Sequence, residues 1–332
     1  MLVDSFPINQ EVELALFRIQ YLYSLVDRFI VAESRFTHKG HAKDLNFTQL
    51  LQFRPDLQSK VEVLEISLNP NNDYWKNEIS TREQIQVYIF SKYPNCHFIL
   101  SDLDEIPSRE QLQNLKSSFG QYHFLTPTYY SFANLQLTDA QHAQWQRGVM
   151  GHTNLSLGEN GGRFIKLPIL SSEEPGAHLS WMQFQSGAIS HKLEATLHVE
   201  FNIKEAKSQD FHDYVCKYQI DHLGRFHMPG HGLLQFIPPF EFTEIQKELF
   251  KIHPEIFSSN ASPYSRLYRL FASLVVTSIY QSRRFRGDIF STFVSQQFTL
   301  SSFIKACLSL IICFIRIQGK NKISNFIRGG FK

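Results

Sequence analysis

Paired cysteines, long apolar runs and repeats are scarce in this sequence, and each absence narrows the class of protein. The four cysteines are scattered and form no Cys-x-x-Cys pair, which argues against a disulfide scaffold and a zinc site. The longest apolar run, ACLSLIICFI, falls well short of the roughly 20 residues that a membrane-spanning helix needs. Hydrophobic residues still make up 43% of the chain, so we expect a globular protein with a sizeable core.

The first residues do not have the pattern expected of a signal peptide, and charge of either sign is unevenly spread along the chain. Asp4 and Glu11 precede any sustained apolar run and no basic segment opens the chain, so we expect the folded part to be cytoplasmic. Residues 261–332 hold 11 of the 33 Lys and Arg residues and a single acid, a net charge of about +10, which leaves the first 260 residues at about −8. We therefore predict a main domain over 1–260 and a basic helical tail over 261–332.

Strand-like and helix-like patterns alternate through the first hundred residues. Apolar residues recur at helical spacing between Glu11 and Leu25, and the β-rich run VDRFIVAES follows and ends near Glu33. Two more β-rich runs, KVEVLEI and CHFIL, enclose a helix predicted over 78–90. This alternation predicts an α/β fold with a mostly parallel central sheet, to which a helical pattern over 264–275 adds C-terminal helices. In such sheets ligands bind beyond the carboxyl ends of the strands.

Three acids crowd the end of one predicted strand in FILSDLDEIPSRE. Asp102, Asp104 and Glu105 would repel one another there, so a positive partner is expected nearby. Carboxylates in an Asp-x-Asp pattern suit Mg²⁺ or Mn²⁺, which could in turn bind a nucleotide diphosphate. The alternative is that these acids only form a turn and cap a helix that begins near Pro107, with Ser108 as a candidate N-cap. The third acid and Glu33 at another strand end favour the metal site.

Four sequence blocks, in a fixed order, resemble glycosyltransferase family 17. They are VDRFIVAES, SDLDEIP, GAHLSW and KLEATLHVEFN, and the resemblance covers roughly residues 3–240. This is the family of the β-1,4-mannosyl-glycoprotein N-acetylglucosaminyltransferase. The resemblance implies a GT-A-like nucleotide-sugar-binding fold, a UDP-N-acetylglucosamine donor, a glycan acceptor and inversion at the anomeric carbon.

The resemblance also implies which residues bind the donor. Asp102 and Asp104 match the family's Asp-x-Asp and become the ligands of a divalent cation, Mn²⁺ or Mg²⁺, and of the diphosphate. Glu33 matches an acid at the nucleotide end of the first strand. Arg82 matches a helix arginine that suits a phosphate, although it could equally pair with Glu78 one helical turn earlier.

Catalytic and acceptor-binding residues follow from the same blocks. Glu105 completes the acidic block, and His178 and Trp181 match the GAHLSW block, although Ala177 replaces the family's aromatic residue. His178 is predicted to act in catalysis and Trp181 to stack on the acceptor sugar; a hydrogen-bonded histidine and a core tryptophan are the alternatives. An inverting transferase also needs a base for the acceptor hydroxyl. The candidates for that base are Glu105, Glu173, Glu174 and Asp210.

The tail and the overall function each leave two interpretations open. Arg and Lys mixed with Phe and Ile over 262–332 suit an anionic membrane surface, which predicts a peripheral enzyme at the inner face acting on a glycan or a lipid-linked glycan; alternatively the tail packs on the core. No nucleic-acid partner is expected, because no binding motif accompanies the basic residues. For function, the alternative to a metal-dependent transferase is a non-catalytic nucleotide-sugar or carbohydrate-binding module.

Overall fold

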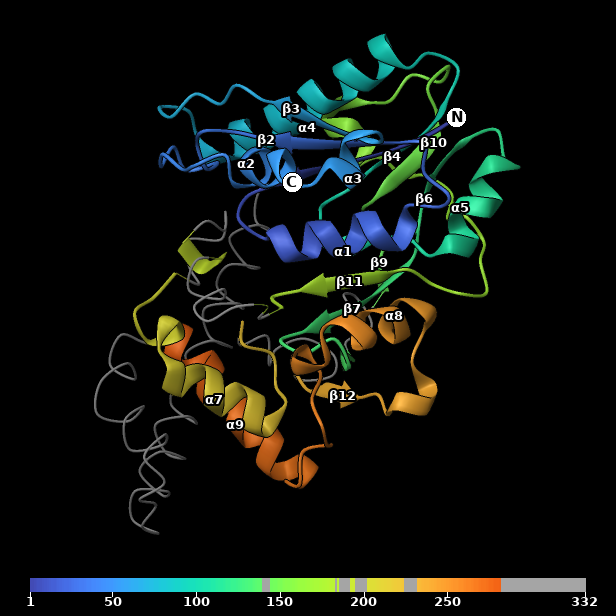
Figure 1. Cartoon of the computed structure of the whole chain (residues 1–332). Coiled ribbons are helices and arrows are strands. Elements are labelled where there is room, and N and C mark those ends of the chain that lie inside the picture. The colour runs from blue at the N-terminus through green and yellow to red at the C-terminus, as the bar shows by residue number, and fades with distance from the viewer. Residues whose placement is uncertain (139–143, 183, 185–191, 195–201, 224–231, 282–332) are drawn as a thin grey trace, which may run out of the picture. The chain divides into compact units, whose positions relative to one another are not determined.

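The computed structural model describes residues 1–138, 144–182, 184, 192–194, 202–223 and 232–281 (Figure 1). The chain forms two compact units, one from residues 1–197 with 235–260 and the other from residues 198–234 with 261–332. The predicted tail belongs to the second unit, and its assignment as a separate functional part stays a prediction.

A six-stranded sheet in the order β3-β2-β1-β4-β10-β6 organises the first unit. Its strands are β1 (Leu2–Ile8), β2 (Arg28–Glu33), β3 (Val61–Glu65), β4 (His97–Leu100), β6 (Gln121–His123) and β10 (Val149–His152). The first four are parallel, and β10 is antiparallel to both β4 and β6. The predicted α/β class with a mostly parallel sheet is confirmed. Strand β1 was not predicted, because Asp4, Ser5 and Pro7 interrupt its apolar pattern.

Helices cover both faces of this sheet, as the alternation of buried strand residues requires. Phe6 and Val31 belong to the core on the side of α1 (Val12–Leu22). Their neighbours on the other face belong to a second core with Ile85 and Ile89 of α4 (Tyr74–Lys92). The two helices predicted from residues 11–25 and 78–90 are therefore the two layers that sandwich the parallel strands.

A second, mixed sheet in the order β12-β8-β7-β11-β5 lies on the far side of α1 from the main sheet (Figure 1). Its strands are β5 (Glu105–Ile106), β7 (Thr126–Tyr130), β8 (Leu135–Leu137), β11 (Ala177–Ser180) and β12 (Leu234–Phe236), and β9 (Gln144–Trp145) pairs with β7. Phe17 of α1 shares one core with Tyr129 of β7 and Leu179 of β11. The chain passes from the first sheet to the second between Leu100 and Glu105, so the acidic stretch is the link between them.

Further helices complete both units. They are α2 (Asn46–Gln52), α3 (Pro55–Gln58), α5 (Arg109–Lys116), α7 (Gln209–Tyr218), α8 (Glu244–Ile252), α9 (Arg266–Gln281), η1 (Glu159–Gly162), η3 (Glu205–Lys207), η4 (Pro239–Glu241) and η5 (Pro254–Ile256). Helix α5 begins as predicted, with Ser108 as N-cap and with Gln111 completing a capping box. In the second unit Arg269 of α9 donates to the carbonyl oxygens of Tyr218 and Gln219, both at 2.9 Å, and so caps the end of α7.

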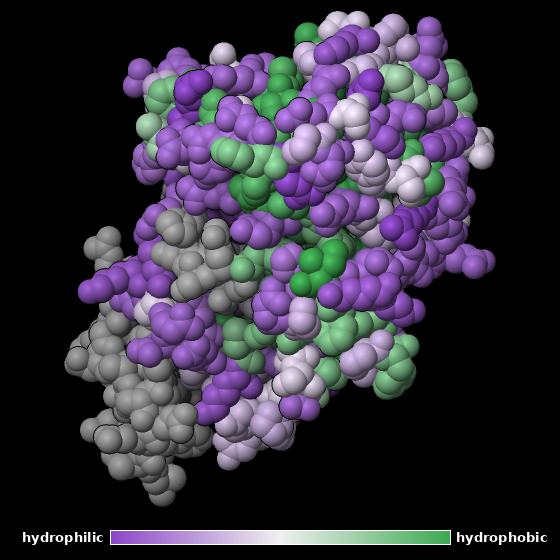
Figure 2. Space-filling view, viewed as in Figure 1, coloured by the Kyte–Doolittle hydropathy of each residue, from purple (hydrophilic) through white to green (hydrophobic). Residues whose placement is uncertain are grey.

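The predicted C-terminal helix corresponds to α9, and the basic segments from residue 282 onward lie outside the described residues. Within the described part of the chain, no helix combines the length and the apolar character that crossing a membrane requires. On the face shown in Figure 2, hydrophilic residues predominate and hydrophobic ones occur in small groups. Scattered exposed side chains such as Phe53 and Phe240 are ordinary for a folded domain.

Candidate active site

The acidic turn, residues 101–105, is a tight connection between the two sheets. The Glu105 N–H donates to the Asp102 carbonyl oxygen at 3.0 Å, which closes the turn. Glu105 then pairs with His178 in the β5–β11 register. Since Ser108 is the residue that caps α5, the helix start does not account for Asp102 or Asp104.

Arg18 of α1 holds this turn from within the core, and the sequence analysis did not single it out. Its guanidinium is fully buried and pairs with Asp4 of β1, Nη2 to Oδ1 at 2.6 Å and Nε to Oδ2 at 2.9 Å. Its Nη1 donates to the carbonyl oxygens of Asp102 at 2.8 Å and Glu105 at 3.1 Å, and its Nη2 donates to Ser101 Oγ at 2.9 Å. Five donors in one rigid plane thus fix the backbone from which the acids project.

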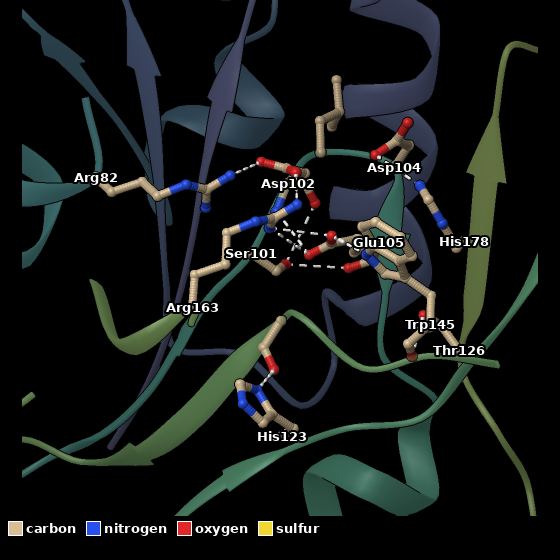
Figure 3. Close-up of polar contacts among 12 residues, drawn as sticks. Arg82, Ser101, Asp102, Asp104, Glu105, His123, Thr126, Trp145, Arg163 and His178 are labelled. Carbon is tan, nitrogen blue, oxygen red and sulfur yellow. Dashed lines mark hydrogen bonds and ion pairs between the residues drawn. The ribbon is translucent and has the colours of Figure 1, made fainter. Parts of the chain in front are cut away.

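Asp102 lies between two arginines, as Figure 3 shows. Its Oδ1 pairs with Arg82 Nη2, and its Oδ2 lies 2.7 Å from Arg163 Nη2. Burial by itself raises the pKa of Asp102, but the charges of Arg163 and Arg82 outweigh it and lower the pKa to about 2. Asp102 is therefore ionised at neutral pH. Arg82 also lies 3.8 Å from Glu78, so the alternative pairing predicted for it is present, although both side chains are largely buried and not on the surface. The phosphate role of Arg82 stays a prediction.

A glycine-rich loop delivers Arg163 to this position. Asn160, Gly161 and Gly162 all have left-handed backbone conformations, with φ of 52°, 62° and 73°. A Cβ on Gly161 would approach Leu100 Cδ2 to 2.6 Å, so both the conformation and the space require glycine there. This close approach to β4 carries Arg163 over the acidic turn.

Glu105 is almost fully buried and its carboxylate is fully engaged. One oxygen accepts from the indole N–H of Trp145 and lies 3.1 Å from Arg163 Nη1, while the other accepts from the Asp102 N–H at 3.1 Å. Burial opposes the charge of Arg163, but Asp102 and Glu105 outweigh it and raise the pKa of the guanidinium above its usual range. Glu105 thus orients Arg163 and the turn.

Asp104 meets a separate pair of basic groups on the side of the second sheet. Its Oδ2 lies 2.9 Å from Lys192 Nζ, and its Oδ1 lies 3.6 Å from His178 Nε2. The His178 ring stacks near that of Trp145, with centroids 5.0 Å apart, and its Nδ1 lies 3.5 Å from Thr128 Oγ1. Burial raises the pKa of Asp104, but Lys192 and His178 outweigh it and hold that pKa well below its usual range.

Trp181 lies at the end of β11 and connects to this group through Lys192. The Lys192 ammonium lies 5.5 Å from the centroid of the Trp181 ring, within range of a cation–π interaction. Trp181 is buried and adopts a left-handed conformation with φ of 64°, which is uncommon for a bulky residue. A strained backbone conformation persists only where the surrounding structure holds it, and such residues are often found at functional sites.

A cleft of about 280 Å³ opens at the carboxyl ends of the parallel strands. Asn9, Ser34, Ile66 and Asp102, which follow β1, β2, β3 and β4 respectively, all line it. Arg82, Asp104 and Lys192 form its charged side, and its apolar side is formed by Leu14, Phe36, Ile66, Leu68 and Leu103. The position agrees with the sequence-based expectation for ligand binding in such sheets.

His38 and Asn9 add neutral polar groups to the cleft. His38 Nε2 lies 3.1 Å from Thr81 Oγ1, and burial together with the charge of Arg82 lowers the His38 pKa to about 4, against the opposing effect of Asp102. The imidazole is therefore neutral at physiological pH. Asn9 Oδ1 is buried and has no hydrogen-bond partner among the described residues, which leaves it available to a donor on a ligand.

Glu33 has a different environment from the other predicted donor-binding residues. Its carboxylate is fully buried and accepts hydrogen bonds from the N–H groups of Phe47 and Thr48, at 3.0 and 2.9 Å, and from Thr48 Oγ1 at 2.7 Å. Lys43, which lines the cleft, lies 3.8 Å away. Glu33 thus fixes the start of α2, and its predicted contact with the donor stays a prediction.

The remaining base candidates lie elsewhere. Glu110 accepts hydrogen bonds from the N–H groups of Glu173 and Glu174, and Glu174 Oε1 accepts from the N–H of Glu244 at the start of α8. Asp210 belongs to the second unit. Among the candidates, Glu105 is the one within the acidic turn.

Comparison with known proteins decides the family. The model of Glycosyltransferase family 17 matches residues 1–220. The chain belongs to glycosyltransferase family 17. The family predicted from four short blocks is thereby confirmed, and membership supports glycosyl transfer as the activity.

Other comparisons of this family 17 chain are more distant. A search of the curated proteins found no match. Among solved structures, the chain is similar to "Mannosyltransferase PcManGT from Pyrobaculum calidifontis in complex with GDP-Man and Mn2+", at 10% identity and a TM-score of 0.31, over 95% of this chain and 86% of that one.

The side chains at this family 17 site are chemically suited to hold a divalent cation. Asp102 and Asp104 supply hard carboxylate oxygens, the ligand class that Mg²⁺ and Mn²⁺ prefer. Among the described residues, no group of three or more His, Cys, Asp or Glu side chains could hold a metal ion. Because Mg²⁺ is commonly bound by one or two carboxylates together with phosphates and water, the pair fits a cation that arrives with a nucleotide.

Sequence reasoning missed three of the basic residues around the acids of this family 17 site. Arg18 lies on the apolar face of α1, and a charged residue within such a face was the available signal. Arg163 directly follows two glycines, a composition that indicates only a loop. Lys192 opens the KLEATLHVEFN block, but nothing in that block indicates that the fold brings this lysine to Asp104.

Proposed function

We propose that this chain is an inverting, metal-dependent transferase that moves N-acetylglucosamine from UDP-N-acetylglucosamine to a glycan acceptor. The observation that best supports this proposal is the cleft at the strand ends, where Asp102 and Asp104 lie beside Arg82 and Lys192. Arg163, which is not among the lining residues, pairs with Asp102. Such a charge pattern suits a diphosphate together with a cation. The GT-A-like name for the fold belongs to the same proposal.

The donor would use both sides of the cleft. Arg82, Arg163 and Lys192 would pair with the diphosphate, for which the guanidinium fork is well shaped. The apolar side near Ile66 and the polar atoms of Asn9 would receive the nucleoside. Glu33 would contribute indirectly, by fixing α2 and the loop that carries Lys43.

A cation held by Asp102 and Asp104 would offset the negative charge that develops on the leaving diphosphate. The protein's own part is to keep both carboxylates ionised and in place. Arg18 does this through the backbone of the turn, and Glu105 does it through the Asp102 N–H and Arg163.

On the acceptor side, we assign His178 as the group that takes the hydroxyl proton. Its ring lies against Trp145 and within 3.6 Å of Asp104, which would stabilise the imidazolium formed. Glu105 would act by holding Arg163, since both of its oxygens are engaged. Trp181 would offer its ring to the acceptor sugar.

The test is release of UDP from UDP-N-acetylglucosamine by the purified chain with Mn²⁺ or Mg²⁺ and a panel of glycan acceptors. We expect metal-dependent turnover that is lost in the Asp102→Asn, Asp104→Asn double variant. Asp56→Asn, which changes a surface aspartate paired with Arg54, serves as the matched control and should keep full activity. Turnover of GDP-sugars but not UDP-sugars would overturn the donor assignment.

A non-catalytic binding module is the second candidate. It is favoured by the pairing of Asp102 and Asp104 with protein cations, which leaves the acids satisfied without any metal. Binding of the nucleotide sugar without turnover against any acceptor would support the module.

The location of the enzyme in the cell is proposed from the sequence. We propose a cytoplasmic enzyme whose residues 262–332 bind an anionic membrane surface, where a lipid-linked glycan would be within reach. Removing residues 262–332 should then abolish sedimentation with vesicles of phosphatidylglycerol, and unchanged sedimentation would exclude this role for the tail.

A further inference from the structure

The charges of the site balance without any ligand. In the described part of the chain the acidic turn contributes three carboxylates, and three Arg or Lys side chains pair with them; these groups are Asp102, Asp104, Glu105, Arg82, Arg163 and Lys192. His178 also lies 3.6 Å from Asp104, and Glu11 and Lys43, which carry opposite charges, line the same cleft. Glu78, which lies 3.8 Å from Arg82, adds one more acid at the margin. Neither a cation nor an anion therefore finds a large excess of opposite charge.

This balance makes separate binding of a metal or a diphosphate unfavourable. A divalent cation that approached Asp102 and Asp104 by itself would be repelled by the nearby Arg82, Arg163 and Lys192. A diphosphate by itself would be repelled by the carboxylates. All of these side chains except that of Asp102 are at most about a quarter exposed, so solvent and salt screen the repulsion only weakly.

Binding of both ligands together removes the conflict. The cation then neutralises the aspartates, and the protein cations are free to pair with phosphate oxygens, so every charge keeps an opposite partner. The two aspartates also supply too few ligands for a complete coordination shell, which phosphates and water would fill.

We infer that Arg82, Arg163 and Lys192 are built-in counter-ions that hold Asp102 and Asp104 in the donor-free enzyme and exchange to the diphosphate when it binds with a divalent cation. This inference rests on the proposed function, because it takes a metal and a nucleotide diphosphate as the ligands. Its consequence is cooperativity: UDP raises the affinity for Mn²⁺, and Mn²⁺ raises the affinity for UDP by the same factor.

Lys192 is the cation best suited to a test. Among the described residues it makes one ion pair, with Asp104, whereas Arg163 also holds Glu105 and Arg82 also approaches Glu78. Its ammonium is a compact charge on a flexible stem, which suits a change of partner. Lys192→Met removes the charge and keeps much of the side-chain volume.

The experiment measures Mn²⁺ binding to the full chain by electron paramagnetic resonance of the free ion, with and without UDP, and corrects for Mn²⁺ bound by UDP in solution. For the wild type we expect weak binding of Mn²⁺ alone and an affinity about tenfold or more higher with UDP. For Lys192→Met we expect Mn²⁺ alone to bind about tenfold more tightly and the effect of UDP to shrink correspondingly. Lys192→Arg should resemble the wild type.

Two controls keep the result interpretable. Lys166→Met removes an exposed lysine of the same unit and should bind Mn²⁺ like the wild type. Lys192→Gln is measured in parallel, so that the charge is tested even if the methionine variant does not fold.

The outcomes separate the inference from the proposed function. If Mn²⁺ and UDP bind the wild type together but neither neutral variant binds Mn²⁺ alone more tightly, the counter-ion role is overturned and the proposed donor site survives. If Mn²⁺ and UDP do not bind the wild type even together, both the donor assignment and this inference fall.

Discussion

Strands β2 and β4 of the same sheet both end in acids, yet the acids have different environments. After β2, Glu33 is fully buried and its oxygens accept from the first N–H groups of α2. After β4, Asp102 and Asp104 face long cationic side chains at the edge of a cleft. Backbone donors at a helix start are fixed in place, whereas arginine and lysine side chains can exchange partners. The first acid is therefore a structural element, and the second pair stays available to ligands.

We expect the largest effect on activity from a change at Asp102 or Asp104, the acids at the cleft. Asp104→Asn removes a charge that the proposed reaction needs, so we expect the turnover rate to fall about ten-thousandfold, or about 5 kcal/mol in the barrier. The assay is UDP release under saturating metal and donor. The variant should still fold, because Lys192 is partly exposed and can reach solvent. A rate within tenfold of the wild type would remove Asp104 from the mechanism.

The next effect concerns Arg18, which makes the end of β4 different from that of β2. Arg18→Met leaves Asp4 buried without a counter-ion and frees three carbonyl oxygens of the turn. Loss of one partner of a buried pair costs about 3–5 kcal/mol, so the free energy of unfolding should fall by that amount in urea denaturation. Arg18→Lys, which keeps the charge with fewer donors, should lie between the two. A loss below about 1 kcal/mol would mean that the turn does not depend on Arg18.

Glu33→Gln tests whether Glu33 is a structural residue that stabilises the start of α2. The amide places a donor beside the N–H groups of Phe47 and Thr48, so we expect the free energy of unfolding to fall by about 2 kcal/mol, while the folded fraction keeps most of its activity. Glu65→Gln is the matched control, because Glu65 ends the neighbouring strand β3 but pairs with Arg35 on the surface and should lose less than about 1 kcal/mol. Loss of donor binding in a stable Glu33→Gln protein would instead support the direct role predicted from the sequence.

Three of the four parallel strands of the main sheet were predictable, because they are short apolar runs that end at turns or charged residues. Strands β2, β3 and β4 and helix α4 were found in this way. Strand β1 was not, because Asp4 and Pro7 are atypical of a central strand. Asp4 is tolerated there only because Arg18 pairs with it, and a contact between two elements is invisible to a local pattern.

The site residues show the same difference between local patterns and contacts made by the fold. Asp102 and Asp104 were predictable, since an acidic cluster after a buried strand is a local signal. Arg163 and Lys192, some 60 and 90 residues further along the chain, reach them through the glycine-rich loop and through the fold. The sequence thus predicted that a positive partner lies near the three acids, but it did not predict which residues supply the charge.

The last predicted effect involves His38, in the loop that joins β2 to α2. Because burial and Arg82 lower its pKa to about 4 in the folded protein, from about 6.5 in the unfolded chain, the unfolded state binds the extra proton first as the pH falls. Stability from this group is complete above about pH 6.5 and is lost as the pH falls toward 4.

His38→Gln should therefore flatten the pH dependence in that window. We expect the difference in unfolding free energy between the variant and the wild type to shift by about 2 kcal/mol in favour of the variant between pH 7 and pH 5, measured by urea denaturation. His41→Gln, which changes an exposed histidine of the same loop, should follow the wild type. A difference that stays constant with pH would mean that the pKa of His38 is the same in the folded and unfolded protein. The cleft beside His38 would then be open to water, and the proposed donor site would be no more buried than an ordinary surface.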